Sequence, residues 1–196
     1  MRRDELEELH YITPISNVPS IISRGILSHN RARRLDPNSV SMPEIQAMRK
    51  NKNVPGGRPL HDYANLYICA RNPMLYKMRN DHLNLCVLRI GPDVLDIPGT
   101  VITDGNAASD YTRFIKSPVG LILVDKWLTF AEYWTHADPI ETWRHKSAKC
   151  AEVLVPDRIP PEYIPGAYVS CEEANVRFES TGTNLPVTIN AHLFFR

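Results

Sequence analysis

The hydrophobic positions along the chain follow two spacings, which together predict a mixed fold. Short runs of apolar and β-branched residues bounded by Gly, Pro or Asp are typical of strands, whereas apolar positions on one helical face after a capping residue are typical of helices. The predicted strands are residues 9–13, 66–70, 85–90, 100–103, 151–155, 167–171 and 186–195. The predicted helices are residues 18–24, 43–49, 73–79 and 172–179, and residues 117–148 combine short helices with loop. Strands and helices do not alternate as βαβ units, so we expect an α+β fold.

Capping residues mark three of the helix ends. Gly25 follows the helix at residues 18–24, in the position where a left-handed glycine commonly ends a helix. Ser41 and Glu44 have the spacing of a capping box for the next helix. Asn72 comes directly before a proline, and this pair is typical of an N-cap followed by the first helical turn.

One carboxylate interrupts the apolar strand predicted at residues 151–155. Glu152 shares one face of this strand with Leu154, while the alanine and the valines point to the other face. The carboxylate must be hydrated, paired or used in chemistry, because burying it alone is costly. Two interpretations are open from the strand alone. Glu152 is either a half-exposed residue of an edge strand, paired with Lys149 or Arg158, or a carboxylate presented into a cleft.

Composition sets the class of protein. The chain has 196 residues, which suits one sizeable domain, and 43% of them are hydrophobic. It has no apolar run long enough to span a membrane and no apolar signal core near the N-terminus, so we expect a cytoplasmic protein without a membrane partner. The four cysteines are widely spaced, without a CxxC pair or a histidine at zinc-finger spacing. We therefore expect reduced, mostly buried thiols and no metal site.

The net charge is only +1, but the basic residues are unevenly distributed. One group lies in the first quarter of the chain: Arg24, Arg31, Arg33, Arg34, Arg49, Lys50 and Lys52. A second group runs from Arg144 to Lys149. Basic patches suit phosphate ligands or a nucleic-acid backbone, but they also occur as solvated faces. Charge alone therefore does not distinguish a binding site from a solvated face. Aromatic residues mixed with cations between residues 117 and 149 suit a groove for single-stranded nucleic acid, although each tryptophan by itself is typical of a core position.

Several common active-site motifs are absent from the sequence. It has no GxxxxGK[ST] phosphate loop, no GxGxxG fingerprint, no GxSxG elbow and no HExxH. A Cys150 nucleophile with His145 as its base is one arrangement to weigh. On the predicted strand Cys150 faces the same side as Glu152, whose negative charge raises the pKa of the thiol. We therefore set cysteine chemistry aside.

Three segments resemble one known family. They are LHYITPISNVPSIISRGIL at residues 9–27, LHDYANLYICARNPMLY at residues 60–76 and AEVLVPDRIPPEYI at residues 151–164. In this order they are similar to DarT, the toxin of a bacterial toxin–antitoxin system and a DNA ADP-ribosyltransferase. The resemblance extends over nearly the whole chain, and the second and third segments make it specific.

The resemblance implies a fold, a reaction and partners. We expect residues 1–196 to form a single ADP-ribosyltransferase domain, a split β-sandwich core with surrounding helices that binds NAD in a central cleft. NAD is then the co-substrate, no metal is needed, and the acceptor is a base in single-stranded DNA. The other expected partner is an antitoxin that removes ADP-ribose, either a macrodomain or a NADAR-type hydrolase. Two alternatives stay open: an NAD-dependent transferase that acts on RNA or protein, and a non-catalytic nucleic-acid-binding domain.

The resemblance also assigns roles to individual residues. The predicted catalytic residues are Glu152 and Arg49, and Arg49 is expected near the NAD phosphates because of its position at the end of a helix before a Gly-rich loop. The predicted cofactor-binding residues are Tyr11, Thr13, Asn17 and Tyr67. The predicted DNA-binding residues are Arg71, Asn72, Met74 and Tyr76 from the second segment, and Arg144, His145 and Lys146 from the second basic group.

The first segment departs from a pattern found in related transferases, which often carry His-x-Thr or His-x-Ser on the first strand. Here Tyr11 stands two residues before Thr13, and the histidine is His10. By alternation Tyr11 and Thr13 share one face, and His10 shares the other with Ile12. We therefore assign Tyr11 and Thr13 to the NAD side and expect His10 to be a structural histidine.

The expected chemistry suits these residues. Cleavage of the nicotinamide–ribose bond produces an oxocarbenium-like ribose, which a nearby carboxylate stabilises. Glu152 can also take the proton of the attacking base, while Arg49 holds the pyrophosphate. Members of the family modify thymine or guanine, and the Tyr11-Ile12-Thr13 order together with the second segment is more similar to the guanine-directed branch. We expect guanine as the acceptor, with thymine as the alternative.

Overall fold

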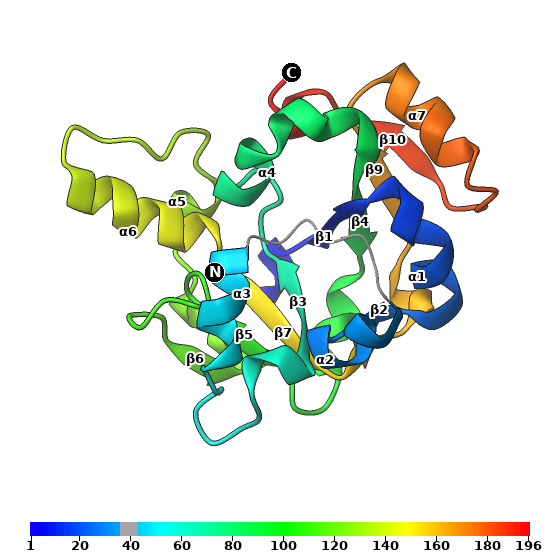
Figure 1. The fold of residues 1–196 in the computed structure, drawn as a ribbon. Coiled ribbons are helices and arrows are strands. Elements are labelled where there is room, and N and C mark those ends of the chain that lie inside the picture. Colours follow the sequence, from blue (N-terminus) through cyan, green and yellow to red (C-terminus); the bar gives the residue numbers. More distant parts are fainter. Residues whose placement is uncertain (36–42) are drawn as a thin grey trace.

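A computed structural model describes residues 1–35 and 43–196, and its centre is an eight-stranded sheet (Figure 1). The order across the sheet is β10-β9-β4-β1-β3-β7-β5-β6. These strands are β1 (Leu9–Pro14), β3 (Tyr63–Tyr67), β4 (Leu85–Ile90), β5 (Val101–Thr103), β6 (Phe114–Lys116), β7 (Glu152–Pro156), β9 (Gly166–Val169) and β10 (Val187–Ile189). A separate two-stranded sheet pairs β2 (Ile26–Leu27) with β8 (Arg158–Ile159).

Short helices surround the sheet. They are α1 (Val18–Arg24), α2 (His29–Ala32), α3 (Pro43–Lys50), α4 (Pro73–Lys77), α5 (Lys126–Phe130), α6 (Pro139–Lys149) and α7 (Glu172–Glu179). Figure 1 shows α7 beside β9 and β10 at one edge, whereas α5 and α6 lie together on the opposite side of the molecule. The mixture of elements is the α+β class that the sequence predicts.

The large sheet is divided at its middle. β1 and β3 share a single registered pair, His10 with Tyr67, whereas β1 and β4 are paired over six residues and β3 and β7 over five. One half therefore carries β10, β9, β4 and β1, and the other carries β3, β7, β5 and β6. This weak junction is the split expected of the core, and it leaves side chains of β1 and β3 facing a common space.

The alternation along β7 is as predicted. Val153 and Val155 are fully buried in the main hydrophobic core, while Leu154 packs in a separate cluster with Leu60 and Tyr63. β7 lies between β3 and β5, so both of its backbone edges are paired. A central strand with apolar residues on both faces is a rigid support for the side chain that begins it.

Local signals predicted several elements well. β4, α1 and α7 have the predicted bounds, and Gly25 ends α1 with φ +85°. A Cβ at Gly25 would lie 2.3 Å from the carbonyl oxygen of Ile159, so only glycine fits this turn. Asn72 caps α4, since its side-chain oxygen accepts the backbone N–H groups of the next two helical residues after Pro73 at 3.0 and 3.1 Å. The capping box predicted at Ser41 lies outside the described residues.

Other bounds differ from the prediction because tertiary pairing sets them. β3 occupies residues 63–67 rather than 66–70, since its register matches Tyr63 with Pro156 and Tyr67 with Glu152. The strand predicted at residues 186–195 ends at Ile189 and is followed by a 3-10 turn at His192–Phe194, which buries Phe194 completely. The short elements β2, α2, β6 and β8 were not predicted, because two to four residues carry too little periodicity to identify them.

Candidate active site

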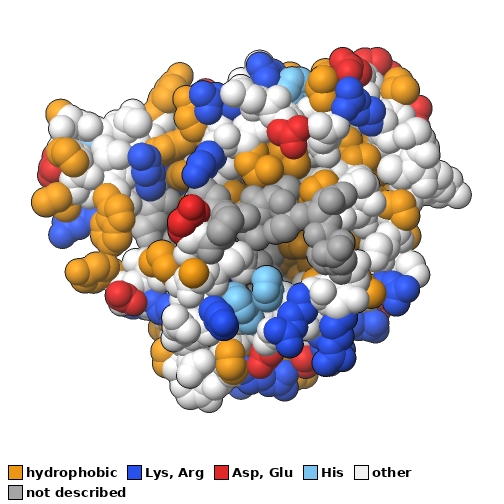
Figure 2. Space-filling model, viewed as in Figure 1, with side chains coloured by type: hydrophobic (Ala, Val, Ile, Leu, Met, Phe, Trp, Pro, Cys, Tyr) orange, Lys and Arg blue, Asp and Glu red, His pale blue; other side chains and the backbone are white. Residues whose placement is uncertain are grey.

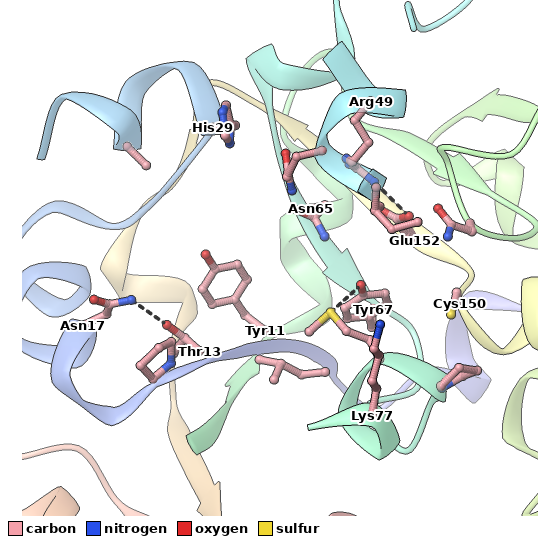
Figure 3. Close-up of a pocket in the computed structure, with 18 of the residues that line it drawn as sticks. Tyr11, Thr13, Asn17, His29, Arg49, Asn65, Tyr67, Lys77, Cys150 and Glu152 are labelled. Carbon is pink, nitrogen blue, oxygen red and sulfur yellow. Dashed lines mark hydrogen bonds and ion pairs between the residues drawn. The ribbon is translucent and has the colours of Figure 1, made fainter. Parts of the chain in front are cut away.

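A cavity of about 670 Å³ opens between the two halves of the sheet (Figure 3). β1 and the segment that follows it contribute Tyr11, Thr13 and Asn17. The opposite wall comes from β3, β7, α3 and α4. Figure 3 shows Glu152 and Arg49 together on this opposite wall, across the cavity from Tyr11. The split of the sheet therefore creates the space that the sequence predicts for a ligand.

Glu152 is buried and fully engaged. Its side chain is 1% exposed, and Nη1 of Arg49 donates to its two carboxylate oxygens at 3.1 and 3.0 Å. The backbone N–H of Ala107 donates to Oε1 at 2.9 Å, and the backbone N–H of Glu152 donates to Thr103 Oγ1 at 3.1 Å. The ion pair with Arg49 and the backbone N–H of Ala107 engage the carboxylate from two elements. Glu152 is thus held in one orientation at the cavity wall.

The alternative interpretation of Glu152 as a half-exposed edge residue is wrong. The strand is central, and neither proposed partner reaches the carboxylate. Lys149 donates to the carbonyl oxygen of Ala131 at 2.8 Å, and Arg158 is exposed and donates to the carbonyl oxygen of Arg24 at 3.4 Å. The partner is Arg49, which is 103 positions away in sequence.

Arg49 is positioned by the end of α3 and by the loop between β5 and β6. It lies in the last turn of α3 and is only 6% exposed. Lys52 follows this helix and donates to the carbonyl oxygen of Ser109, in the same loop that provides the N–H of Ala107 to Glu152. One loop therefore supports both members of the buried pair.

The residues predicted to bind NAD all line this cavity. Asn17 donates to Thr13 Oγ1 at 3.3 Å, so these two side chains form one polar unit on the β1 side. Tyr67 lies directly opposite Glu152 in the pairing of β3 with β7, and its hydroxyl donates to the sulfur of Met74 at 3.1 Å. Burial, reinforced by the nearby charge of Glu152, holds the pKa of Tyr67 well above its ordinary value. Tyr67 is therefore a neutral hydrogen-bonding group beside the carboxylate.

His10 does not line the cavity, whereas Tyr11, Thr13 and also Ile12, which alternation had placed on the face of His10, do line it. Nε2 of His10 lies 3.2 Å from Glu8 Oε1, and Glu8 also accepts hydrogen bonds from Arg89 at 2.6 Å and Tyr168 at 2.8 Å. These contacts hold the pKa of Glu8 at about 2, because the bonds from His10, Arg89 and Tyr168 outweigh the cost of burial. His10 is part of a structural network on the far face of the sheet.

The residues predicted to bind DNA differ in where the structure places them. Met74, Tyr76 and Lys146 line the cavity. Arg144 is exposed but outside the cavity lining. Arg71 is mostly covered and donates to backbone carbonyl oxygens at 3.1 and 3.0 Å, so it ties chain segments together.

Two of the predicted DNA contacts are contradicted by burial. Asn72 is 0% exposed, and its side chain caps α4 and donates to the carbonyl oxygen of Cys69 at 3.0 Å. His145 is 6% exposed, with one ring nitrogen 2.8 Å from His136 and the other 3.0 Å from the carbonyl oxygen of Leu128. The polar groups of both side chains are hydrogen-bonded inside the protein, so neither side chain is exposed for contact with a nucleic acid in this structure.

The structure also tests whether Cys150 could act as a nucleophile with His145 as its base. Cys150 lines the cavity, but burial and then the charge of Glu152 raise the pKa of its thiol to about 12. The thiol is protonated at neutral pH and is a poor nucleophile. Its proposed base, His145, is engaged by His136 and by a backbone carbonyl, so the dismissal of cysteine chemistry is supported by geometry as well.

Sequence reasoning missed some of the lining residues. Asn65 points into the cavity from β3, on the same face as Tyr63 and Tyr67, so alternation with a correct strand assignment would have found it. Asn106 lines the cavity from the loop after β5, and His29 lines it from α2. A loop and a four-residue helix give no periodic signal that could have identified these two.

The first basic group does not form one uniform patch. Figure 2 shows Lys and Arg side chains gathered over α2, where Arg31, Arg33 and Arg34 are exposed. Arg31 contacts Asp157 at 3.1 Å, and Arg58 contacts the same carboxylate at 2.8 Å. Arg49, by contrast, is buried against the catalytic candidate, so this group includes both solvated cations and a site residue.

Within the part of the chain that the structure describes, no helix is long and apolar enough to cross a membrane. Residues 1–35 and 43–196 also contain no group of three or more His, Cys, Asp or Glu placed to hold a metal ion. The expected cytoplasmic location and the expected metal-free chemistry stay predictions.

Comparison with known proteins identifies the family. The DarT family model, described as ssDNA thymidine ADP-ribosyltransferase, matches residues 10–195. A Thermosipho africanus protein, a DNA ADP-ribosyl transferase–DNA ADP-ribosyl glycohydrolase fusion, is 36% identical over 200 residues. This match covers 96% of the present chain and 49% of the fusion, so the chain spans about half the length of that relative.

Solved structures agree with the sequence match. Thermus sp. 2.9 DarT in complex with ADP-ribosylated ssDNA superimposes with a TM-score of 0.81 at 26% identity, over 96% of each chain. The same protein in complex with NAD+ gives a TM-score of 0.74 at 25% identity, over 96% of this chain and 98% of that one. The fold is therefore that of the ADP-ribosyltransferases. The chain belongs to the DarT family of DNA ADP-ribosyltransferases.

Proposed function

We propose that this chain, as a single domain, transfers ADP-ribose from NAD to a base in single-stranded DNA. The observation that carries the proposal is the buried Glu152–Arg49 pair on the wall of a cavity large enough for a dinucleotide. Family membership supports it, because a relative of the same fold has been solved with NAD+ and with ADP-ribosylated ssDNA. The reaction needs a carboxylate, a phosphate-binding cation and a cleft, and this site provides all three.

The division of the cavity suggests how NAD lies in it. Thr13 and Asn17 provide a polar unit on the β1 side for the nicotinamide end, and Tyr11 provides an aromatic face. Both hydrogen bonds from Arg49 to Glu152 use Nη1, so Nε and Nη2 are not engaged by the carboxylate. Arg49 can therefore hold a pyrophosphate oxygen while it still orients Glu152.

Glu152 serves the two charge changes of the reaction. The bond between nicotinamide and ribose breaks, nicotinamide leaves as a neutral molecule, and positive charge develops on the ribose. The carboxylate of Glu152 stabilises this charge and accepts the proton that the attacking nitrogen loses as its bond to ribose forms. Its buried position strengthens the interaction, because little water screens it.

Guanine is the acceptor that we favour. The order of Tyr11, Ile12 and Thr13 on β1 and the form of the second segment support this choice. The exocyclic amine of guanine is a poor nucleophile until its proton is removed, and Glu152 can remove it. Thymine makes a similar demand through its ring nitrogen, and the description of the family model specifies thymidine, so thymine is the competing acceptor.

We further propose that the chain is the toxin of a toxin–antitoxin pair. Its partner would be a hydrolase that removes ADP-ribose from DNA, of the macrodomain or NADAR type. The Thermosipho relative supports this pairing, because its name joins a DNA ADP-ribosyl transferase to a DNA ADP-ribosyl glycohydrolase in one chain.

The test is a labelling experiment with NAD that carries a label in its adenine. Purified protein is incubated with single-stranded DNA, duplex DNA, RNA or a protein mixture in separate reactions. The proposal predicts label in single-stranded DNA and its loss in the Glu152→Gln variant. Label in RNA or protein would replace the proposed acceptor, and no label in any acceptor would point to a non-catalytic binding domain.

A further inference from the structure

The loop between β5 and β6 has no regular secondary structure, yet it provides a backbone hydrogen bond to the carboxylate of Glu152. We refer to its residues, 104–113, as the carboxylate loop. The N–H of Ala107 donates to Glu152 Oε1 at 2.9 Å, and Ala107 is completely buried. Because the loop has no helix or strand pairing of its own, other contacts must hold this N–H group in place.

The two oxygens of the Glu152 carboxylate have different surroundings. Oε1 accepts Arg49 Nη1 at 3.1 Å and the N–H of Ala107 at 2.9 Å. Among the described residues, Oε2 accepts only Arg49 Nη1, at 3.0 Å. Each carboxylate oxygen can accept about two hydrogen bonds, so Oε2 retains capacity for one more. Nη1 contacts both oxygens, and it is therefore the N–H of Ala107 that distinguishes them.

An ion pair closes the carboxylate loop at its base. Asp104 is the first residue of the loop and Arg113 is the last. Asp104 Oδ1 accepts the backbone N–H of Arg113 at 2.8 Å, and Oδ2 accepts its Nε at 2.7 Å. The side chain of Asp104 is mostly covered, whereas that of Arg113 is exposed. Both ends of the loop are thus held together by one carboxylate.

A second set of contacts orients the peptide group between Asn106 and Ala107. This group is planar and trans, so its C=O and its N–H point in opposite directions. The C=O of Asn106 accepts the hydroxyl of Thr112 at 2.6 Å and the N–H of Ser109 at 2.9 Å. The N–H of Ala107 on the other side of the group is the donor to Glu152. Thr112 therefore helps to direct that donor, although it does not touch Glu152.

Lys52 connects the carboxylate loop to the helix that carries Arg49. Its backbone N–H donates to the carbonyl oxygen of Arg49 at 3.2 Å, and its own carbonyl accepts the N–H of Leu60 at 2.9 Å. Its Nζ donates to the carbonyl oxygen of Ser109 and lies 3.3 Å from Asp110. Lys52 is outside the cavity lining, so its side chain contacts the loop and not the cavity. One residue thus joins the supports of both members of the buried pair.

From these contacts we infer that the carboxylate loop is a clamp that occupies Oε1 of Glu152 and reserves Oε2 for the reaction. Lys52 and Thr112 are its positioning residues, and neither lines the cavity. A carboxylate fixed before the substrate arrives needs no reorganisation when positive charge develops on the ribose. Oε2 is then the oxygen that stabilises this charge and takes the proton of the attacking base. The inference deepens the proposed function and rests on transfer to DNA.

The test compares kcat with the two KM values and with NAD affinity. Lys52→Met removes Nζ but keeps most of the apolar stem, and Thr112→Val removes the hydroxyl but keeps the branched shape. We expect each variant to lower kcat roughly 5- to 50-fold, because a loosened carboxylate is in the productive orientation for less of the time. The KM for NAD, the KM for the oligonucleotide and the calorimetric NAD affinity should stay within about twofold, since the backbone contacts of Lys52 that support Arg49 remain.

Conservative variants and a matched control make the result specific. Lys52→Arg and Thr112→Ser keep the donor groups, so kcat should return to within about threefold of the unmodified protein. Lys50→Met removes an exposed lysine at the end of the same helix, and its kcat should be unchanged. The calorimetric stoichiometry of NAD counts the folded molecules in each preparation, so a loss of folding is separated from a fall in kcat.

Distinct outcomes overturn distinct statements. If the unmodified protein transfers ADP-ribose to DNA but Lys52→Met and Thr112→Val keep its kcat, the clamp is wrong and the proposed function stands. A rise in either KM at constant kcat would also overturn the clamp, because the residues would then act on binding. So would a kcat for Lys52→Arg as low as that for Lys52→Met, or an equal fall for Lys50→Met. If the unmodified protein labels no DNA, the proposed function fails and the clamp fails with it.

Discussion

One nitrogen of Arg49 holds both carboxylate oxygens of Glu152, at 3.1 and 3.0 Å, and both side chains are nearly inaccessible to solvent. A buried ion pair is costly to form but more costly to break, because removal of one partner leaves a charge without compensation. The pair therefore links the chemistry of the site to the stability of the fold. We therefore expect substitutions at Glu152 and at Arg49 to differ in how they affect the reaction and the stability of the fold.

For Glu152, we expect both Gln and Ala variants to lose transfer to DNA by at least about 100-fold, since neither can stabilise the ribose cation or accept a proton. Glu152→Ala also leaves Arg49 unpaired and should destabilise the fold by about 3–5 kcal/mol, less the extent to which cavity water solvates the guanidinium. Glu152→Gln keeps a hydrogen-bonding oxygen for Ala107 and Arg49 and should melt at a higher temperature than the alanine variant. Melting temperature and transfer rate are measured side by side for each variant. Near-normal transfer by either variant would contradict the assignment of Glu152 as the catalytic carboxylate.

For Arg49, we expect Arg49→Ala to weaken NAD binding roughly 10- to 100-fold, because a charge-assisted bond to phosphate is worth about 1.5–3 kcal/mol. Arg49→Lys retains the charge but loses the planar fork, so it should recover only part of the affinity. Titration of NAD into each variant measures this directly. Arg144→Ala, at an exposed position outside the cavity lining, is the matched control. Unchanged affinity in Arg49→Ala would move the phosphate contact to Arg31, Arg33 or Arg34.

The acceptor base is tested with matched single strands. One oligonucleotide lacks guanine, a second lacks thymine, and a third contains both. Because guanine is the acceptor that we propose, we expect the strand without thymine to be modified as well as the third and the strand without guanine to stay unmodified. Full modification of the guanine-free strand would establish thymine instead. Equal labelling of duplex and single strand would contradict the argument that the base must leave a stack.

His61 should make stability depend on pH. It stacks on His29 with ring centroids 4.1 Å apart, and burial, followed by the charges of His29 and Arg49, lowers its pKa to about 4. The unfolded chain therefore binds a proton near pH 6.5 that the folded protein takes up only near pH 4. Its contribution to stability is complete above pH 6.5 and is lost as the pH falls towards 4.

The measurement is the melting temperature between pH 7 and pH 4.5. We expect a steeper fall for the unmodified protein than for His61→Phe, which has no proton to bind. His192→Gln changes an exposed histidine and serves as the control, with the slope of the unmodified protein. Parallel curves for the unmodified protein and His61→Phe would contradict the assignment.

The sequence predicted strand faces and helix ends correctly where the signal is local. Alternation along a strand is a property of the backbone, so it separated Leu154 from Val153 and Val155 on β7. On β1 it predicted Tyr11 and Thr13 at the cavity but missed Ile12, which lines it as well. Capping chemistry is equally local, and it located the ends of α1 and α4 at Gly25 and Asn72. These features need no knowledge of the rest of the chain.

The sequence by itself thus determined the faces of the strands, the ends of the helices and, through its motifs, the family. Only the tertiary structure decided which charge meets Glu152, because Arg49 and Ala107 reach it from 103 and 45 positions away. The tertiary structure likewise turned Asn72 and His145 from expected DNA contacts into buried supports, and it joined Phe195 to Tyr76 and Trp134. The reason is physical: propensity and periodicity depend on adjacent residues, whereas burial and ion pairing depend on the sheet that brings distant segments together.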